Sequence, residues 1–347
     1  MGTILNRLKL IYAIYQIVAL CYSAGTCSAQ NVSAFFVFGD SLVDVGNSQF
    51  IDTSVKSAYP DGVDFVKGTE EELGFKDYSP PFLDPNTIGD VILKGVNYAC
   101  AGSGILNSTG YINGDHISLS NQVGNFAKTR EEIISRLGEA EAKKFLRQAL
   151  YIVSIGSDDI ILRLISPSNG FYYLDKLISE LRSQLTMLYN LDARKIAVFN
   201  VAPLGCIPFN RDVYFLSNGC VGFLNKQVQE YNTELKSLLQ ELTPNLTGST
   251  FVYVDANAIF EDISQNYKSY GFENADSSCC VGGTLGSHGG LFACGPSSHF
   301  CEDRTKYVFW DRFHPSEAFN LITAKKMLDG GLDYVSPMNL RQLANSH

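Results

Sequence analysis

A serine near one end of the chain and a histidine near the other have surroundings that indicate chemistry. Ser41 lies in the segment FGDSL, directly after a short apolar run, and we expect it at the start of a helix. Backbone N–H groups and the helix dipole favour negative charge at such a position. The alternative is that Ser41 or Asp40 only caps the helix, which is a common use of both residue types.

His314 lies in the segment WDRFHP, a tight aromatic turn before a helical stretch, with Asp311 three residues earlier. At this spacing the carboxylate can accept a hydrogen bond from one ring nitrogen and leave the other free to receive a proton. A capping role or a salt link explains an isolated Asp-x-x-His equally well.

Alternating strands and helices must position these residues. The expected strands are nearly continuous apolar runs, as in parallel sheets covered on both faces, and lie at 34–38, 96–99, 150–155, 195–201 and 251–254. Amphipathic stretches between and after them predict helices at 119–137, 172–191, 221–242 and 316–328. The alternation predicts one α/β domain over residues 30–347, with a mostly parallel sheet between helix layers.

The first 29 residues have the pattern of a secretory signal peptide. Arg7 and Lys9 precede the apolar run 10–22, and small residues follow up to Ala29, where we expect cleavage. A short membrane anchor is the alternative, but the run is shorter than the roughly 20 residues that a span needs. We therefore expect an extracellular protein, with the cell wall as one possible location.

Composition excludes several classes of partner. The 347 residues carry 27 Lys and Arg against 36 Asp and Glu, a formal charge of −9, without a basic cluster. Such a chain is a poor candidate for nucleic acids or anionic membranes. The sequence does not indicate an oligomeric state.

The cysteines predict disulfides. Nine are present, and cleavage after Ala29 would leave seven. We expect Cys206 to pair with Cys220 across a turn-rich loop, and two further bridges to form among Cys279, Cys280, Cys294 and Cys301. Cys100 is predicted to be a buried free thiol. A zinc site is the competing interpretation of the last cluster, but it contains no CxxC pair. Three sequons, at Asn31, Asn107 and Asn245, fit a secreted chain.

The combination of motifs resembles the GDSL esterase/lipase family, the plant branch of the SGNH hydrolases. The similar segments are FVFGDSLVD at 36–44, GVNYA at 95–99, IGS at 155–157, NVAPLGC at 200–206 and FWD at 309–311. The resemblance implies a flavodoxin-like three-layer sandwich that hydrolyses carboxylic esters without a metal or organic cofactor. It further implies that Ser41 is the nucleophile, His314 the general base and Asp311 the residue that orients it.

The sequence departs from the family at the oxyanion hole, to which the Ser41 N–H would contribute. A Gly-Arg-Phe-Ser-Asn-Gly-like block is missing, and Gly68 is only a weak substitute for its glycine. Asp158 stands where the family has an Asn that donates to the oxyanion. Loss of one such donor costs about 10²–10³ in rate. Asp158 can donate only if it is protonated, which burial or a carboxylate such as Asp159 would favour.

Two hypotheses about function remain. The first is a secreted serine esterase that acts on lipid esters or on acylated cell-wall or metabolite esters. The second is a catalytically impaired relative that binds an acylated or glycan ligand without efficient turnover. A thiol enzyme that uses Cys100 ranks below both, because the sequence gives that cysteine no local base.

Overall fold

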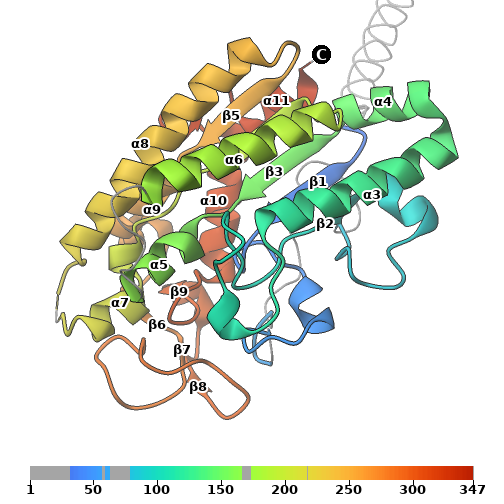
Figure 1. Cartoon of the computed structure of the whole chain (residues 1–347). Coiled ribbons are helices and arrows are strands. Elements are labelled where there is room, and N and C mark those ends of the chain that lie inside the picture. The colour runs from blue at the N-terminus through green and yellow to red at the C-terminus, as the bar shows by residue number, and fades with distance from the viewer. Residues whose placement is uncertain (1–31, 57–58, 63–78, 166–172, 217, 347) are drawn as a thin grey trace, which may run out of the picture. The chain divides into compact units, whose positions relative to one another are not determined.

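A six-stranded sheet crosses the part of the protein that the structure describes (Figure 1). This computed structural model describes residues 32–56, 59–62, 79–165, 173–216 and 218–346. The predicted signal peptide, Asn31 and Gly68 lie outside the described residues. In sheet order the strands are β10 (Val335–Ser336), β5 (Thr250–Val254), β4 (Lys195–Phe199), β3 (Leu150–Ser154), β1 (Phe35–Gly39) and β2 (Gly95–Asn97).

The strand order places a crevice between β1 and β3. All neighbouring strands of this sheet are parallel except β10, which pairs antiparallel with β5. The chain passes from β1 outward to β2 and then returns to β3 on the other side of β1. In doubly wound sheets, ligands bind beyond the carboxyl ends of the strands at such a reversal. Ser41 follows β1 and Asp158 follows β3, so both lie at this edge.

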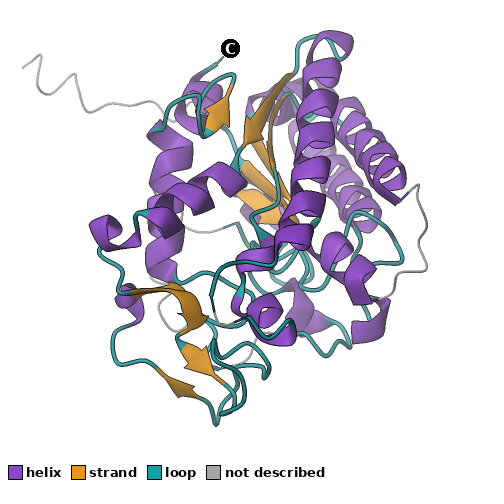
Figure 2. Cartoon of the chain, turned by 90° about the vertical axis from the view of Figure 1, so that its left-hand side faces the viewer, coloured by secondary structure: helices purple, strands orange, loops and turns teal. Residues whose placement is uncertain are grey.

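Helices cover both faces of the sheet (Figure 2). Along β1, Phe36 and Phe38 pack in the core with α3 (Leu119–Leu137), α6 (Tyr173–Asn190) and α8 (Gly222–Asn245). Phe35 and Val37 point to the opposite core, which holds α9 (Ala256–Gln265), α10 (Glu317–Asp329) and α11 (Leu340–Asn345). The period-two alternation of side chains thus gives each helix layer its own apolar surface.

The remaining elements are short. The other α-helices are α4 (Glu139–Gln148), α5 (Ser157–Ile165) and α7 (Pro208–Val213). The 3-10 helices are η1 (Asn47–Phe50), η2 (Gly89–Lys94), η3 (Tyr111–Asn113), η5 (Leu204–Cys206), η6 (Tyr267–Tyr270) and η7 (Arg304–Lys306). Two small sheets pair β6 (Asn274–Ser278) with β9 (Tyr307–Phe309), and β7 (Cys280–Val281) with β8 (His299–Phe300).

Three disulfides brace the segments around these small sheets. The predicted Cys206–Cys220 bridge is confirmed. Cys279 pairs with Cys301 and Cys280 with Cys294, so the predicted second and third bridges are confirmed and their connectivity is defined. Cys100 is a buried free thiol, as predicted. Among the described residues, no group of His, Cys, Asp or Glu could hold a metal, and no helix is long and apolar enough to cross a membrane.

Candidate active site

Ser41 lies in a turn after β1, and the prediction that it begins a helix is wrong. Two hydrogen bonds shape the turn: Val43 N donates to the Asp40 carbonyl at 3.3 Å, and Leu42 N donates to Asp40 Oδ1 at 3.1 Å. The next helix, η1, begins only at Asn47. The Asp40 side chain therefore accepts a local backbone hydrogen bond and bends the chain. Such side-chain hydrogen bonds compete with helix formation, and Asp forms them readily.

The strand end before Ser41 is closely packed. A Cβ at Gly39 would collide with the carbonyl of Ser154 on the neighbouring β3, so no larger residue fits there. The Gln122 side chain of α3 accepts from Gly39 N and donates to the Gly39 carbonyl, each at 2.8 Å. Asp40 N donates to the Ser154 carbonyl at 3.2 Å. These contacts fix where the chain leaves the sheet and hence where Ser41 stands.

His314 lies in the turn between β9 and α10. The Asp311 carboxylate accepts from the backbone N–H groups of Phe313 at 2.8 Å and His314 at 2.7 Å. His314 Nδ1 lies 3.0 and 2.9 Å from the two carboxylate oxygens of Asp311. The predicted Asp311–His314 contact is therefore present, and it leaves Nε2 as the ring nitrogen that faces the cavity.

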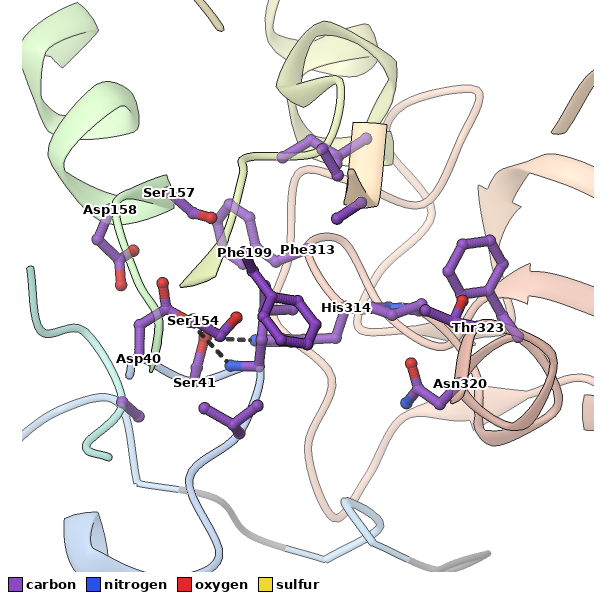
Figure 3. A pocket seen from close by; sticks show the side chains of 18 of the residues that line it. Asp40, Ser41, Ser154, Ser157, Asp158, Phe199, Phe313, His314, Asn320 and Thr323 are labelled. Carbon is purple, nitrogen blue, oxygen red and sulfur yellow. Dashed lines mark hydrogen bonds between the residues drawn. The ribbon is translucent and has the colours of Figure 1, made fainter. Parts of the chain in front are cut away.

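The two halves of the site meet at the carboxyl edge of the sheet (Figure 3). His314 Nε2 lies 2.8 Å from Ser41 Oγ, although 273 positions separate the two residues. Ser41, His314 and Asp311 thus form one chain of hydrogen bonds, in the order that a serine nucleophile, its base and an orienting carboxylate require.

The turn that carries His314 rests on α7 and on the disulfide-braced segment. Phe209 N of α7 donates to the Arg312 carbonyl at 3.0 Å, and the Phe209 and Phe313 rings lie 4.8 Å apart. Cys279 N donates to the Phe309 carbonyl at 3.0 Å, and Cys280 N donates to the Trp310 carbonyl at 2.7 Å. Segments far apart in sequence therefore set the position of the imidazole.

A buried carboxylate, Asp212, joins α7 to the loop between Cys280 and Cys294. It accepts backbone N–H bonds from Ser287, His288 and Gly290, and its Oδ1 lies 2.9 Å from His288 Nδ1. Burial opposes its charge, but the bonds from Gly290 and His288 hold the pKa of Asp212 below its usual range. We did not predict this pair from the sequence, where 76 positions separate the two residues.

Three carboxyl groups gather beside Ser41 and His314. Burial, opposed by the Leu42 N–H and His314, raises the pKa of Asp40 to about 7. Burial and then the charges of Asp40 and Asp159 raise the pKa of Asp158 well above its ordinary value. Burial also raises the pKa of Asp159 to about 6, against three hydrogen bonds from the segment at 105–109. Within the described residues, Asp40 Oδ2 is buried without a hydrogen-bond partner.

These carboxyl groups also act on the imidazole. Burial alone would lower the pKa of His314, but Asp311, followed by Asp158 and Asp40, raises it to about 9. Burial would raise the pKa of Asp311, but His314 and the N–H groups of the turn hold it below its ordinary value. In Figure 3 the Asp158 carboxyl group points toward Asp40 and Ser41.

Other candidate residues from the sequence have different surroundings. Burial and then Asp44 raise the pKa of Cys100 to about 11, so its thiol is a poor nucleophile at neutral pH. Asn107 and Asn245 are both exposed. Gly68 and Asn31 lie outside the described residues.

The fold and the site define the class of protein. It is a doubly wound α/β protein that holds serine, histidine and aspartate in the geometry of a serine hydrolase. The family described as GDSL-like lipase/acylhydrolase matches residues 35–327, and the chain belongs to this family of ester hydrolases.

Two Arabidopsis thaliana relatives show how far the similarity extends. GDSL esterase/lipase At4g16230 is 44% identical over 365 residues, which cover 97% of this chain and 99% of the relative. GDSL esterase/lipase At2g23540 is 40% identical over 341 residues, covering 90% of this chain and 88% of the relative. The first alignment is longer than this chain of 347 residues, so that relative has residues within the aligned region that this chain lacks.

Proposed function

We propose that this chain is a secreted serine esterase that hydrolyses carboxylic esters through an acyl-enzyme. Ser41 Oγ attacks the ester carbonyl carbon while His314 Nε2 takes the hydroxyl proton, and Asp311 stabilises the imidazolium. The tetrahedral intermediate then expels the alcohol, which receives the proton from His314. Water repeats the sequence on the acyl-enzyme and releases the carboxylic acid. The observation that carries this proposal is the 2.8 Å contact between Ser41 Oγ and His314 Nε2.

The oxyanion requires donors, and we propose the Ser41 N–H and the protonated carboxyl group of Asp158. The surroundings of Asp158 favour its neutral form, as described above, and the same surroundings favour protonated His314. Catalysis needs the proton on Asp158 and not on the imidazole. If Asp158 and His314 share one proton, only the fraction of molecules with the proton on Asp158 can catalyse the reaction.

The experiment is hydrolysis of p-nitrophenyl esters by the secreted protein and by its Ser41→Ala variant. Ser237→Ala, on an exposed stretch of α8, is the matched control. We expect activity and organophosphate labelling of Ser41 in the wild type and the control, and neither in Ser41→Ala. Labelling at another residue would contradict the proposed nucleophile.

The shared proton also favours a second candidate, a protein that binds an acylated ligand and turns it over inefficiently. A folded wild type that binds an ester but does not hydrolyse it would favour this function. Recovery of activity in Asp158→Asn would then identify the carboxyl group at position 158 as the cause.

Secretion belongs to the same proposal. The three disulfides are typical of oxidising compartments, and exposed Asn107 and Asn245 are accessible to glycosylation. Sequencing the N-terminus of the protein recovered from the medium tests the expected cleavage after Ala29.

A further inference from the structure

A cavity of about 600 Å³ opens beside Ser41 and His314 and extends well beyond the reacting atoms. The serine, the histidine and Asp158 line one part of it. The rest is mainly apolar, and it includes side chains of the sheet, of α9, α10 and α11, and of the loops that follow β1 and β4. Hydrolysis of a small ester uses only the first part, so the extension requires its own explanation.

The sheet forms one wall of the extension. Phe35 and Val37 of β1 and Ile152 of β3 line the cavity, and each is only 5% exposed. Phe35 is the first residue of β1, whereas Ser41 lies beyond its last residue. Four residue steps along a strand cover about 13 Å, so the apolar wall runs the length of β1 beneath the nucleophile.

Helix α10 forms the facing wall. Asn320, Thr323, Ala324 and Met327 line the cavity at the spacing of one helical face. The seven steps from Asn320 to Met327 cover about 10 Å, a length similar to that of the sheet wall. In Figure 3, Asn320 and Thr323 lie on the opposite side of the catalytic pair from Asp158.

The chemistry of the α10 wall changes along the helix. The polar residues Asn320 and Thr323 belong to the first turns of α10, which follow His314 in the chain, whereas Ala324 and Met327 come later. Most of the lining is apolar and favours a group that needs no hydrogen-bond partners, because a buried polar group without a partner costs free energy. A mainly apolar space whose walls run the length of a strand fits an alkyl chain better than a sugar or a charged group.

We propose that this extension binds a long unbranched alkyl chain of the ester substrate, and that Ala324 and Met327 limit its length. The inference rests on the proposed ester hydrolysis and adds the class of ester. The alkyl chain can belong to the acyl group or to the alcohol of the ester. The acyl group is attached at the carbonyl carbon that Ser41 attacks, and the alcohol is attached at the oxygen that leaves.

Chain-length profiles test the inference in two arms. The acyl arm compares p-nitrophenyl butyrate with p-nitrophenyl dodecanoate, and the alcohol arm compares butyl butyrate with dodecyl butyrate. Each buried methylene contributes about fourfold to kcat/KM while it remains inside the cavity. We expect the longer ester to be favoured at least about tenfold in one arm, which identifies the side that enters. Equal kcat/KM values within both arms would overturn the inference.

Matched variants of α10 test where the alkyl chain binds. Ala324→Leu puts a branched side chain into the cavity, and Lys325→Leu puts the same side chain on the exposed face of α10. Ala324→Leu should lower kcat/KM for the favoured long ester at least about tenfold and for butyrate at most about twofold, whereas Lys325→Leu leaves the profile unchanged. Thr323→Leu, in the same wall, replaces Ala324→Leu if that variant does not fold. Identical profiles for the cavity variant and Lys325→Leu would contradict the inference.

A binding measurement separates this inference from ester hydrolysis itself. Ser41→Ala is titrated with cis-parinaric acid, a fluorescent fatty acid, with and without Ala324→Leu or its replacement. Binding that is weakened at least about tenfold by the cavity substitution supports the alkyl site even if the wild type hydrolyses no ester. Absence of binding to Ser41→Ala overturns the alkyl site, whatever the esterase assays show.

Discussion

Replacing Asp158 by Asn should make the enzyme faster at neutral pH. His314 must be neutral to accept the Ser41 proton, and with a pKa of about 9 it is neutral in only about one molecule in a hundred at pH 7. The charge of Asp158 contributes to this high pKa. The neutral amide removes that charge and also supplies a permanent donor to the oxyanion. Each unit by which the pKa of His314 falls gives about tenfold more neutral imidazole at pH 7.

The assay is kcat/KM for p-nitrophenyl butyrate from about pH 6 to about pH 10, because this parameter reports the pKa values of the free enzyme. Activity of Asp158→Asn should rise with pH through a pKa of His314 that lies below the value of about 9 in the wild type. Asp158→Ala is the control: it removes the same charge without supplying a donor. The rise of kcat/KM with pH should shift to lower pH by a similar amount in Asp158→Ala. Its maximal kcat/KM should be about 10²–10³-fold below that of Asp158→Asn.

Two results would refute this reasoning. If the acid limb stays near pH 9 in Asp158→Asn, the charge of Asp158 does not set the pKa of His314. If the Asn and Ala variants reach the same plateau, the side chain at this position is not an oxyanion donor, and another group serves the oxyanion.

Three further predictions concern the base and its supports. Asp311→Asn should lower kcat about 10⁴-fold in steady-state kinetics, because the amide no longer holds the imidazole in the required tautomer. Replacing Cys206 and Cys220 together by Ala should lower the free energy of unfolding in urea by about 3 kcal/mol, as expected for a bridge between residues 14 positions apart; an unchanged midpoint would contradict it. Asp212→Ala should lower the unfolding free energy by about 3 kcal/mol, because several buried N–H groups lose their acceptor; a loss similar to that of an exposed Asp would contradict the buried role.

Local sequence patterns predicted most of the central elements. The helix expected at 119–137 is α3, with the same bounds, and the strand expected at 150–155 is β3 with one residue fewer. These segments have strong periodicity or long apolar runs, so the local signal agrees with the tertiary environment. The antiparallel strand β10 has only two residues, Val335 and Ser336, and its pairing with β5 leaves no local pattern.

The residues of the proposed active site could be located from the sequence, but their electrostatic surroundings could not. Motif spacing pointed to Ser41, Asp311 and His314, which the structure brings into one hydrogen-bonded chain. The helix expected at Ser41 does not form because the Asp40 side chain bends the backbone there. The proximity of Asp40 to Asp158 depends on the adjacency of β1 and β3, which is set by strand pairing across more than 100 residues. Single-sequence periodicity carries no information about such pairing.

Ser41 and His314 are held in place by interactions of different chemical kinds. Ser41 stands on the hydrophobic sheet, whereas the turn with Asp311 and His314 receives backbone bonds from Cys279 and Cys280, each held by a disulfide. A reductant can therefore loosen the base while the nucleophile and the sheet stay in place. We expect thiols to silence the enzyme at concentrations that leave its helices folded. Newly made chains would then acquire activity only after these disulfides form.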